Sequence, residues 1–336
     1  MTAPAASEGQ VVPAVLGGTA TAADDLAHVE QWLHTLLAQA AGPRVAALGG
    51  ELARAGGKRL RPRLFLLAFR SLSATPPTPA TYRLAAALEL LHLATLAHDD
   101  VIDGARLRRS RPSLNAAYGE RPAVLVGDFF FSRFLAAAAP TGPRALQVMA
   151  AAISAMVEGE LEQARHRFDL QLEEKDYYGI IAKKTAAFLA AACEVGALAA
   201  RASRARRSAL RRFGLYLGCA FQIQDDILDY VGDPDVLGKP SGSDLTQGVV
   251  TLPLIHTLRA GRAAASVQQL LQRPPLTAEK LARVRRQVAE GDGVPYARAR
   301  ADGFFASALE ELQALPESLA RCELVELVKV LQGREY

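Results

Sequence analysis

Apolar residues recur at helical spacing through most of this chain of 336 residues, with few turn signals between them. A spacing of three and four residues places apolar side chains on one face of a helix. The first segment with this pattern runs from about Ala27 to Leu52, and another runs from about Arg83 to Asp103. Residues 1–25 lack periodicity and are expected to form a loose tail before one domain spanning 26–336.

Glycine and proline mark the breaks between the periodic segments. Loops are predicted at Ser71–Thr81, Arg109–Pro112, Pro140–Pro143, Gly232–Gly248, Arg273–Thr277 and Gly291–Pro295. No βαβ alternation and no internal repeat of 20–50 residues is present. Alanine, leucine and arginine dominate the composition, whereas residues that favour strands are few. The pattern therefore predicts an all-α fold.

Targeting and redox signals favour a cytoplasmic protein. Cys193, Cys219 and Cys322 lie far apart without metal-ligand spacing, as expected of free thiols in a reducing compartment. No lysine or arginine precedes Arg44, so the start lacks the basic residues of a signal peptide. The most apolar stretch, Pro122–Pro140, contains Asp128 and Arg133, so we expect a soluble chain and no integral membrane protein.

The net charge of +4 and a pI of about 9.0 raise the question of nucleic-acid binding. The most basic stretch, Arg201–Arg212, has six arginines in twelve residues. No aromatic residue interrupts it, and no nucleic-acid motif lies nearby. We interpret it as a solvated helix face and expect no nucleic-acid partner.

Three carboxylates lie close together at the end of the second periodic segment. Asp99 and Asp103 are four residues apart and share one face of a helix, while Asp100 points to the side. Their mutual repulsion is relieved by solvent or by divalent cations, and Mg²⁺ binds through one or two carboxylates plus substrate phosphates. Acids disfavour the negative end of a helix dipole, so a function is more plausible than solubility alone.

A second cluster repeats the same spacing. Asp225 and Asp229 are four residues apart with Asp226 between them, and Leu217 and Phe221 share the face of Asp225. One such motif arises by chance in acidic helices. Two on apolar helices, together with a basic loop elsewhere, are strong support for a metal-diphosphate site.

The basic loop begins with Gly56 and Gly57, which let the backbone approach an anion closely. Lys58, Arg59 and Arg61 follow and supply charged donors suited to phosphate. More cations come after the first acid cluster, at Arg106, Arg108, Arg109 and Arg111. The acids would hold one diphosphate through metal, and the basic groups would hold a second one directly.

Seven motifs occur in an order that resembles the all-trans isoprenyl diphosphate synthase family, of the medium- to long-chain type, across roughly residues 27–336. They are Gly57–Pro62, Glu89-x-x-His92, Asp99–Asp103 with Arg108-Arg109, Lys184-Thr185, Phe221–Asp229, Gly238–Leu245 and Thr251–Pro253. The resemblance implies a single-domain helical bundle around a central cavity, several Mg²⁺ ions and a homodimer. It also implies two substrates, isopentenyl diphosphate and an allylic diphosphate such as farnesyl or geranylgeranyl diphosphate.

The resemblance also implies roles for individual residues. The isopentenyl diphosphate positions are Lys58, Arg61, His92 and Arg109. The allylic diphosphate positions are Arg108, Lys184, Thr185, Gln222 and Lys239. The main metal ligands are Asp99, Asp103 and Asp225, supported by Asp100, Asp226 and Asp229; the first three, with Lys184 and Lys239, would carry catalysis. For His92 the alternative is an ordinary core histidine, and for Thr185 an ordinary helix threonine. Val249 departs from the family, since many relatives have a basic residue there.

Product length is predicted from the helix below Asp99. Thr95, Leu91 and Leu88 lie roughly 6, 12 and 16 Å deeper, and an isoprene unit extends roughly 4–5 Å. Ala94 and Thr95 are small, so the shallow floor is open and a heptaprenyl to nonaprenyl product is favoured, for a quinone side chain. Such a product could partition into a membrane. The deeper floor could come from Phe129, Phe130, Phe131 and Phe134, and geranylgeranyl diphosphate is the runner-up product.

Two other functions compete with this interpretation. A class I terpene cyclase shares the first acid motif but lacks the second one and the basic loop. A non-catalytic subunit of a two-chain prenyl synthase typically loses acids from one cluster, whereas both clusters are intact here.

Overall fold

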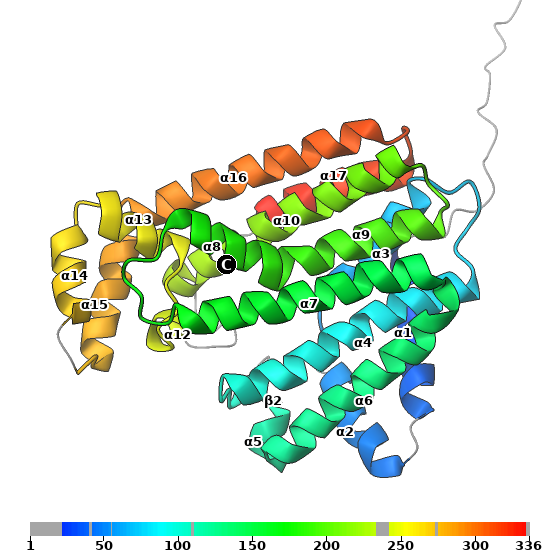
Figure 1. Ribbon diagram of the computed structural model, residues 1–336, viewed down its shortest axis with the longest axis horizontal. Coiled ribbons are helices and arrows are strands. Elements are labelled where there is room, and N and C mark those ends of the chain that lie inside the picture. The colour runs from blue at the N-terminus through cyan, green and yellow to red at the C-terminus, as the bar shows by residue number, and fades with distance from the viewer. Residues whose placement is uncertain are drawn as a thin grey trace, which may run out of the picture.

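Helices make up most of the residues that the computed structural model describes, which are 22–39, 42–54, 56–108, 111–232, 242–272 and 275–333 (Figure 1). The N-terminal half contains α1 (Ala22–Ala38), α2 (Pro43–Arg54), α3 (Leu60–Arg70), α4 (Pro79–Ile102), α5 (Leu114–Tyr118), α6 (Glu120–Ala138) and α7 (Pro143–Arg165). The middle contains α8 (Glu174–Ile181), the π-helical turn η2 (Ala182–Ala186), α9 (Ala187–Ala199), α10 (Arg204–Val231) and α12 (Ser243–Thr246). The C-terminal part contains α13 (Leu252–Ala260), α14 (Ala264–Gln272), α15 (Ala278–Ala289), α16 (Gly293–Glu311) and α17 (Leu319–Gln332).

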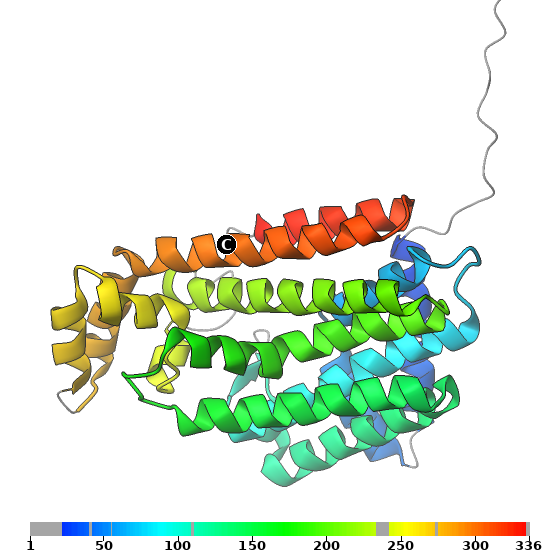
Figure 2. The ribbon, with the colours of Figure 1, turned by 45° about the horizontal axis from the view of Figure 1, so that its top comes forward.

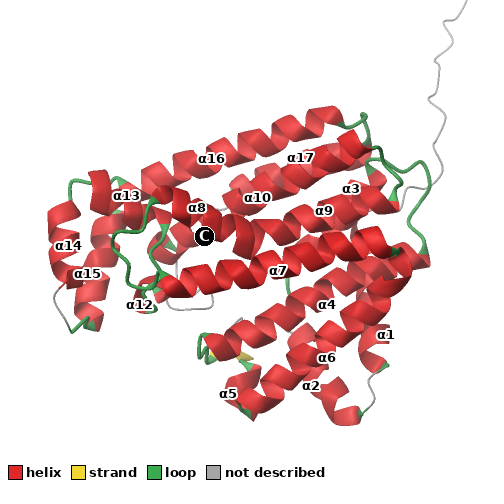
Figure 3. Cartoon of the chain, in the orientation of Figure 1, coloured by secondary structure: helices red, strands yellow, loops and turns green. Residues whose placement is uncertain are grey.

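The predicted all-α class is confirmed. Within the described residues the strands are confined to β1 (Leu107–Arg108) and β2 (Arg111–Pro112), an antiparallel pair that follows α4 (Figure 3). Two short 3₁₀ turns, η1 (Ala139–Thr141) and η3 (Leu312–Ala314), extend α6 and α16. Most long helices run side by side along the length of the molecule (Figure 2).

The predicted segment from Ala27 to Leu52 is two helices, and the first begins earlier than expected. Asp25, which we placed in a loose tail, is buried within α1. Its carboxylate accepts hydrogen bonds from Arg70 (2.6 Å from both Nε and Nη2) and from Tyr82 Oη (2.7 Å). This long-range ion pair fixes the start of α1, which periodicity alone does not show. Residues 1–21 lie outside the described residues.

Helix α4 also begins before its predicted start. Thr78 caps it, accepting a bond from Thr81 N at 3.3 Å, while Thr81 Oγ1 accepts from Thr78 N at 3.2 Å. Pro79 then stands at the first helical position, where a missing N–H costs nothing. The predicted loop Ser71–Thr81 therefore ends at Thr78, and α4 runs unbroken to the first acid cluster.

Two clusters of buried apolar side chains form the core and meet at α3 and α9. One cluster joins α1, α4, α6 and the start of α7, and the other joins α8, α10 and α13 to α17. Leu64 and Leu67 of α3 belong to one cluster and Phe65 and Leu66 to the other. Because α3 is buried on both sides, the basic loop before it is held firmly against the centre of the bundle.

Two glycines let the helix that contains η2 lie between α7 and α10. A Cβ atom at Gly159 would come within 2.5 Å of the backbone nitrogen of Lys184, and one at Gly218 within 2.4 Å of Ala186 Cα. Such contacts are too short for any side chain, so the backbones can approach this closely only at glycine. The result is that Lys184 and Thr185 are positioned between α7 and α10, on the wall of the cavity described below.

Residues 120–141, which include α6, are long and apolar enough to cross a membrane by length and composition, although we expected no such segment. Only 39% of the most apolar window is buried, because Leu125 and Leu135 face outward. The other face packs on α4 through side chains such as Phe130. A single helix of this kind is weak support for a membrane span, since core helices of soluble proteins have the same properties.

Candidate active site

A cavity of about 1120 Å³ opens between the basic loop, α4, α7, η2, α10 and α17. It brings together groups that are far apart in sequence. The predicted site residues that line it are Lys58, Arg61, His92, Thr95, Asp99, Asp103, Arg108, Lys184, Thr185, Gln222 and Asp225. Its apolar wall comes from Leu96, Met156, Val157, Leu161, Phe221, Leu327, Val330 and Leu331. The lining of this one cavity therefore includes acidic, basic and apolar side chains.

The acids that face the large cavity come from two different helices. Asp99 and Asp103 lie at the C-terminal end of α4, and Asp225 lies on α10. Burial raises the pKa of Asp99 to about 6, and the charge of Glu160 adds to the effect, while Lys184 and Arg108 oppose it. Any cation that enters the cavity would therefore stabilise the ionised form of Asp99.

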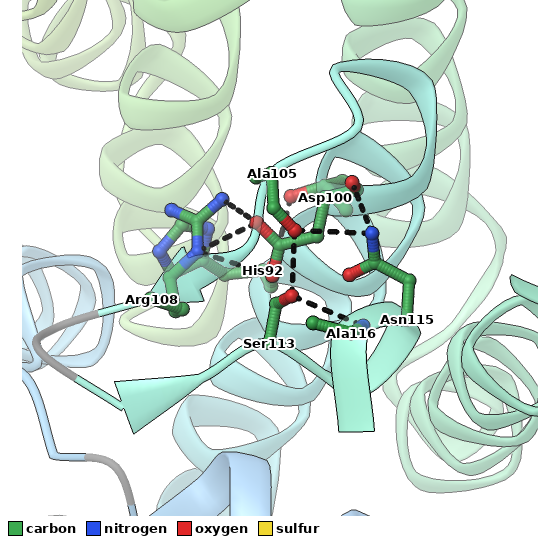
Figure 4. Close-up of polar contacts among 8 residues, drawn as sticks. His92, Asp100, Ala105, Arg108, Ser113, Asn115 and Ala116 are labelled. Atoms are coloured by element: carbon green, nitrogen blue, oxygen red, sulfur yellow. Dashed lines mark hydrogen bonds and ion pairs between the residues drawn. The ribbon is translucent and has the colours of Figure 1, made fainter. Parts of the chain in front are cut away.

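Asp100, predicted as a supporting metal ligand, instead binds Arg108 (Figure 4). Its side chain is only 1% exposed and accepts from Arg108 Nε at 2.9 and 3.2 Å and also from Nη2. The backbone oxygen of the same residue accepts a bond from Asn115 Nδ2 at 3.0 Å. The turn of the helix points Asp100 away from the face of Asp99, so it orients Arg108 toward the cavity and does not line it.

Asp229, the last acid of the second cluster, is likewise directed away from the cavity. Its carboxylate accepts from Ser243 Oγ at 2.8 Å and from the backbone nitrogens of Ser243 and Asp244 at 3.3 and 3.1 Å. It therefore holds the start of α12 against α10. Neither Asp100 nor Asp229 lines the large cavity, although both are in the described part of the chain.

A smaller neighbouring cavity of about 110 Å³ is lined by Asp226 together with Asp103, Lys184 and Asp244. Tyr177 Oη and Gln222 Nε2 donate to the Asp226 carboxylate at 2.6 and 2.8 Å. Burial, reinforced by the charge of Asp244, raises the pKa of Asp226 to about 8 despite these bonds. Asp226 is therefore a protonatable carboxyl beside the large cavity, and a nearby cation would favour its ionised form.

A divalent metal fits this donor set only together with a substrate. Among the described residues, no three His, Cys, Asp or Glu side chains come close enough to hold a metal ion by themselves. Mg²⁺ keeps open positions for water and phosphate oxygens and needs only one or two carboxylates. Asp99 and Asp103 on one wall and Asp225 on the other would hold such ions, with a substrate diphosphate supplying the remaining oxygen ligands.

The groups predicted for isopentenyl diphosphate line the cavity beside the basic loop. Lys58 is exposed, and the guanidinium of Arg61 lies 5.2 Å from the centre of the Phe188 ring. His92 is half-buried on α4, two turns below Asp99. Arg109 lies outside the described residues, so its predicted place is not described.

Arg59 was expected to bind phosphate, and it does line the large cavity, but carboxylates already bind its guanidinium. Its side chain is only 8% exposed. It binds Glu30 (Nε–Oε1 2.6 Å), Glu89 (Nη1–Oε1 2.9 Å) and the backbone oxygen of Ala53 (3.0 Å). The left-handed backbone at this residue (φ 46°) separates its direction from that of Lys58 and Arg61. The ion pairs of Arg59 therefore anchor the loop, and Lys58 and Arg61 line the same cavity on either side of it.

The groups predicted for the allylic diphosphate are connected to one another. Thr185 Oγ1 donates to Gln222 Oε1 at 2.7 Å, and Gln222 in turn donates to Asp226. Lys184 Nζ lies 2.9 and 2.8 Å from the two carboxylate oxygens of Glu160. This chain of bonds fixes the side chains of η2 relative to α10. Lys239 lies outside the described residues.

Two residues of the site were missed by the sequence reasoning. Glu160 binds Lys184 and contributes to the raised pKa of Asp99. Arg167 Nη2 donates to Asp103 Oδ1 at 3.2 Å from the turn after α7. That turn is bonded to the loop containing Val249, since Phe168 N donates to Gly248 O at 2.7 Å. The only sequence signal was the density of charge at the end of α7.

The residues that were predicted to limit product length along α4 do not all line the cavity. Thr95 lines the cavity, whereas Leu88, Leu91 and Ala94 are at most 3% exposed and belong to the core. A helix turns by about 100° per residue, so Leu91 and Ala94 point about 80° and 140° away from Asp99. Leu88 shares the face of Asp99 but is covered completely. Of the four phenylalanines, Phe130 and Phe134 are fully buried core residues.

Comparisons with known proteins agree with one another. Residues 43–288 match the family described as polyprenyl synthetase. The chain is 40% identical to heptaprenyl diphosphate synthase component 2 of Geobacillus stearothermophilus, covering 93% of this chain and 97% of that protein. It is 36% identical to octaprenyl diphosphate synthase of Haemophilus influenzae, covering 88% and 89%. A polyprenyl synthase of Caulobacter crescentus, crystallised with calcium and isoprenyl diphosphate, is 36% identical with a TM-score of 0.87, covering 93% and 95%.

Proposed function

Because this chain belongs to the polyprenyl synthetase family, we propose that it is a trans-polyprenyl diphosphate synthase that elongates an allylic diphosphate with isopentenyl diphosphate. The predicted family and enzyme class, a prenyltransferase, are confirmed by the same relatives. The observation that carries the proposal is one cavity with two acidic helices, a separate basic loop and an apolar wall. These are the parts needed to ionise one diphosphate, hold another and shelter a hydrocarbon.

The residues of the allylic site stabilise the departure of diphosphate. Lys184 and Arg108, together with Lys239, neutralise the charge that develops as the allylic C–O bond breaks. Divalent cations held by Asp99, Asp103 and Asp225, which we propose to be Mg²⁺, supply further positive charge when bound. Phe221 and the neighbouring apolar residues exclude water, which would quench the allylic cation.

The second half-reaction joins the two substrates. Lys58, Arg61, His92 and Arg109 hold the diphosphate of isopentenyl diphosphate, so that its double bond faces the allylic cation. The π electrons of that double bond form the new carbon–carbon bond in a 1'-4 condensation. A proton then leaves the adjacent carbon, and the released diphosphate accepts it. The product is an allylic diphosphate longer by one unit, ready for another cycle.

We propose a product in the heptaprenyl to nonaprenyl range, serving as the side chain of a quinone, with farnesyl or geranylgeranyl diphosphate as primer. The relatives named as heptaprenyl, octaprenyl and nonaprenyl diphosphate synthases support this range. The small side chain of Thr95 on the cavity wall also supports it. Geranylgeranyl diphosphate, the runner-up product, has less support.

Thr95→Phe is expected to shorten the product by several isoprene units. The larger ring would fill the cavity one turn below Asp99, roughly 6 Å from the reacting end. Chromatography of the dephosphorylated alcohols measures the shift. Ala94→Phe is the comparison variant. Ala94 is buried in the core and does not line the cavity, so this ring should change product length less than the ring of Thr95→Phe. A Thr95→Phe product of unchanged length would show that the growing chain leaves along another wall.

Arg61→Ala is expected to raise the KM for isopentenyl diphosphate by about one to two orders of magnitude, with little change for the allylic primer. A charged hydrogen bond to phosphate is worth roughly 1.5–3 kcal/mol. Steady-state kinetics with each substrate varied in turn measure the split. Lys58→Ala should act in the same direction. Equal effects on both substrates would mean that the loop is assigned to the wrong diphosphate.

We also propose a homodimer of cytoplasmic chains. The exposed apolar side chains of α6, including Val124, Leu125 and Leu135, supply a surface that a second copy could bury.

The relative named component 2 raises the question whether another chain is required. Assaying the purified chain alone with labelled isopentenyl diphosphate, a primer and Mg²⁺ answers this. Elongation would support the proposal that this chain is active without a different subunit, and a folded chain that does not elongate the primer would contradict it.

A further inference from the structure

Arginines are concentrated where α10 begins, at the end of the bundle away from the acid clusters (Figures 1 and 2). We define the arginine patch as Arg201, Arg204, Arg206, Arg207 and Arg211. All but the half-buried Arg207 are exposed. In the described chain no acidic side chain pairs with the first four, and Arg211 Nε lies 3.7 Å from Glu194. The next arginine, Arg212, is instead bound to Glu311 at 2.6 Å.

This placement is electrostatically unfavourable for the helix itself. The N-terminal end of a helix carries partial positive charge and favours acids, yet the first turn of α10 contains arginines and no acid. Ser203 caps the helix by accepting a bond from Arg206 N at 3.4 Å, which offsets part of this cost. Since the first four arginines of the patch pair with no acidic side chain within the described chain, an external anionic surface is their natural counterpart.

The patch lies at the distance that a long product would reach. Arg204 and Asp225 are 21 residues apart on one helix, which is roughly 32 Å. Seven extended isoprene units span roughly 28–35 Å at roughly 4–5 Å each. The start of α4 lies at the same end of the bundle (Figure 1). A tail of that length would come near the patch if it extended from Thr95 along α4, past the buried Leu91 and Leu88.

An exposed apolar side chain accompanies the arginines. Leu319 begins α17 and is 66% exposed. It follows the turn η3, which packs against α10, and the Arg212–Glu311 ion pair ties the end of α16 to the same helix. Exposed arginines together with an exposed leucine at one end of a molecule are typical of surfaces that lie on an anionic bilayer, with the apolar group entering the lipid boundary.

We propose that the arginine patch and Leu319 bind an anionic phospholipid surface, so that the apolar product leaves the enzyme directly into the bilayer. This inference rests on the proposed function only for the origin of the product. A bilayer fits better than a nucleic acid, because no aromatic residue lies between Arg201 and Arg212 to stack with bases.

The test is sedimentation of the purified full-length chain, without substrates, with phosphatidylcholine vesicles and with mixed phosphatidylcholine–phosphatidylglycerol vesicles. Binding is expected only to the mixed vesicles and should weaken as salt is added. The triple variant Arg204→Gln, Arg206→Gln, Arg211→Gln should bind about a hundredfold more weakly. Its turnover on water-soluble primers should equal that of the wild type, because the patch is remote from the cavity.

The matched control is Arg283→Gln, Arg286→Gln, Arg298→Gln, which removes the same charge from exposed positions on α15 and α16 at the other end of the molecule. It should bind vesicles like the wild type. Leu319→Ser should weaken binding at unchanged charge. Equal loss in both triple variants would reduce the effect to net charge and overturn the proposal. Binding to double-stranded DNA but not to mixed vesicles would overturn it too. Either failure leaves the synthase activity, assayed separately, unaffected.

Discussion

Asp99→Asn and Asp225→Asn are each expected to lower kcat by about a hundredfold to a thousandfold while leaving the helical fold intact. Both carboxylates line the same cavity from opposite helices, and both would bind the cations that stabilise the leaving diphosphate. Removing one preorganised electrostatic group from an active site typically has an effect of about this size. Single-turnover kinetics at saturating Mg²⁺ measure the loss, and circular dichroism monitors the fold.

Asp229→Asn provides the comparison for this prediction. Its carboxylate lies in the same motif but caps α12 and does not line the large cavity. Asp229→Asn should lower the free energy of unfolding. At a temperature where this variant is still folded, its kcat should fall much less than that of Asp99→Asn or Asp225→Asn. Near-normal turnover in Asp99→Asn or Asp225→Asn would refute the assignment of two acidic helices to one reaction.

Arg59→Ala is expected to lower the free energy of unfolding by about 3–5 kcal/mol. The substitution leaves Glu89, whose side chain is 3% exposed, as a buried carboxylate without its partner, and it also releases Glu30. Denaturant titration followed by circular dichroism measures the change. Lys58→Ala, one residue away and exposed, should change stability by less than about 0.5 kcal/mol.

The same pair of variants separates anchoring from substrate binding. Lys58→Ala should affect the KM for isopentenyl diphosphate without affecting stability. If Arg59→Ala instead raises that KM while the free energy of unfolding stays at the wild-type value, Arg59 is a ligand for diphosphate and not an anchor of the loop.

The sequence was sufficient to predict the parts of the site that depend on local spacing. The pattern of Asp99 and Asp103 on one face of a helix needs only helical periodicity, and so does that of Asp225. The glycines before Lys58 likewise indicated a loop suited to an anion. These features were predictable because each depends on residues within a few positions of one another.

What could not be predicted depends on contacts between distant segments. The partners of Arg59 are 29 and 30 residues away, so no local pattern distinguishes it from Lys58 and Arg61. Asp100 and Asp229 occupy motif positions, but later segments bind both carboxylates. The burial of Leu91 and Ala94 depends on the helices packed against α4, which an estimate of depth along one helix leaves out.

The π-helical turn η2 inserts one extra residue into what is otherwise a continuous helix from α8 to α9. One added residue rotates everything after it by about 100° relative to a regular helix. The segment that supplies Lys184 and Thr185 is thereby set in a different register from Phe188 and the core residues that follow. A protein engineer who deleted a single residue here would regularise the helix and turn the two side chains out of the cavity. Point substitutions of Lys184 or Thr185, by contrast, should change the groups that we propose to bind the allylic diphosphate without changing the helical register of the core residues that follow.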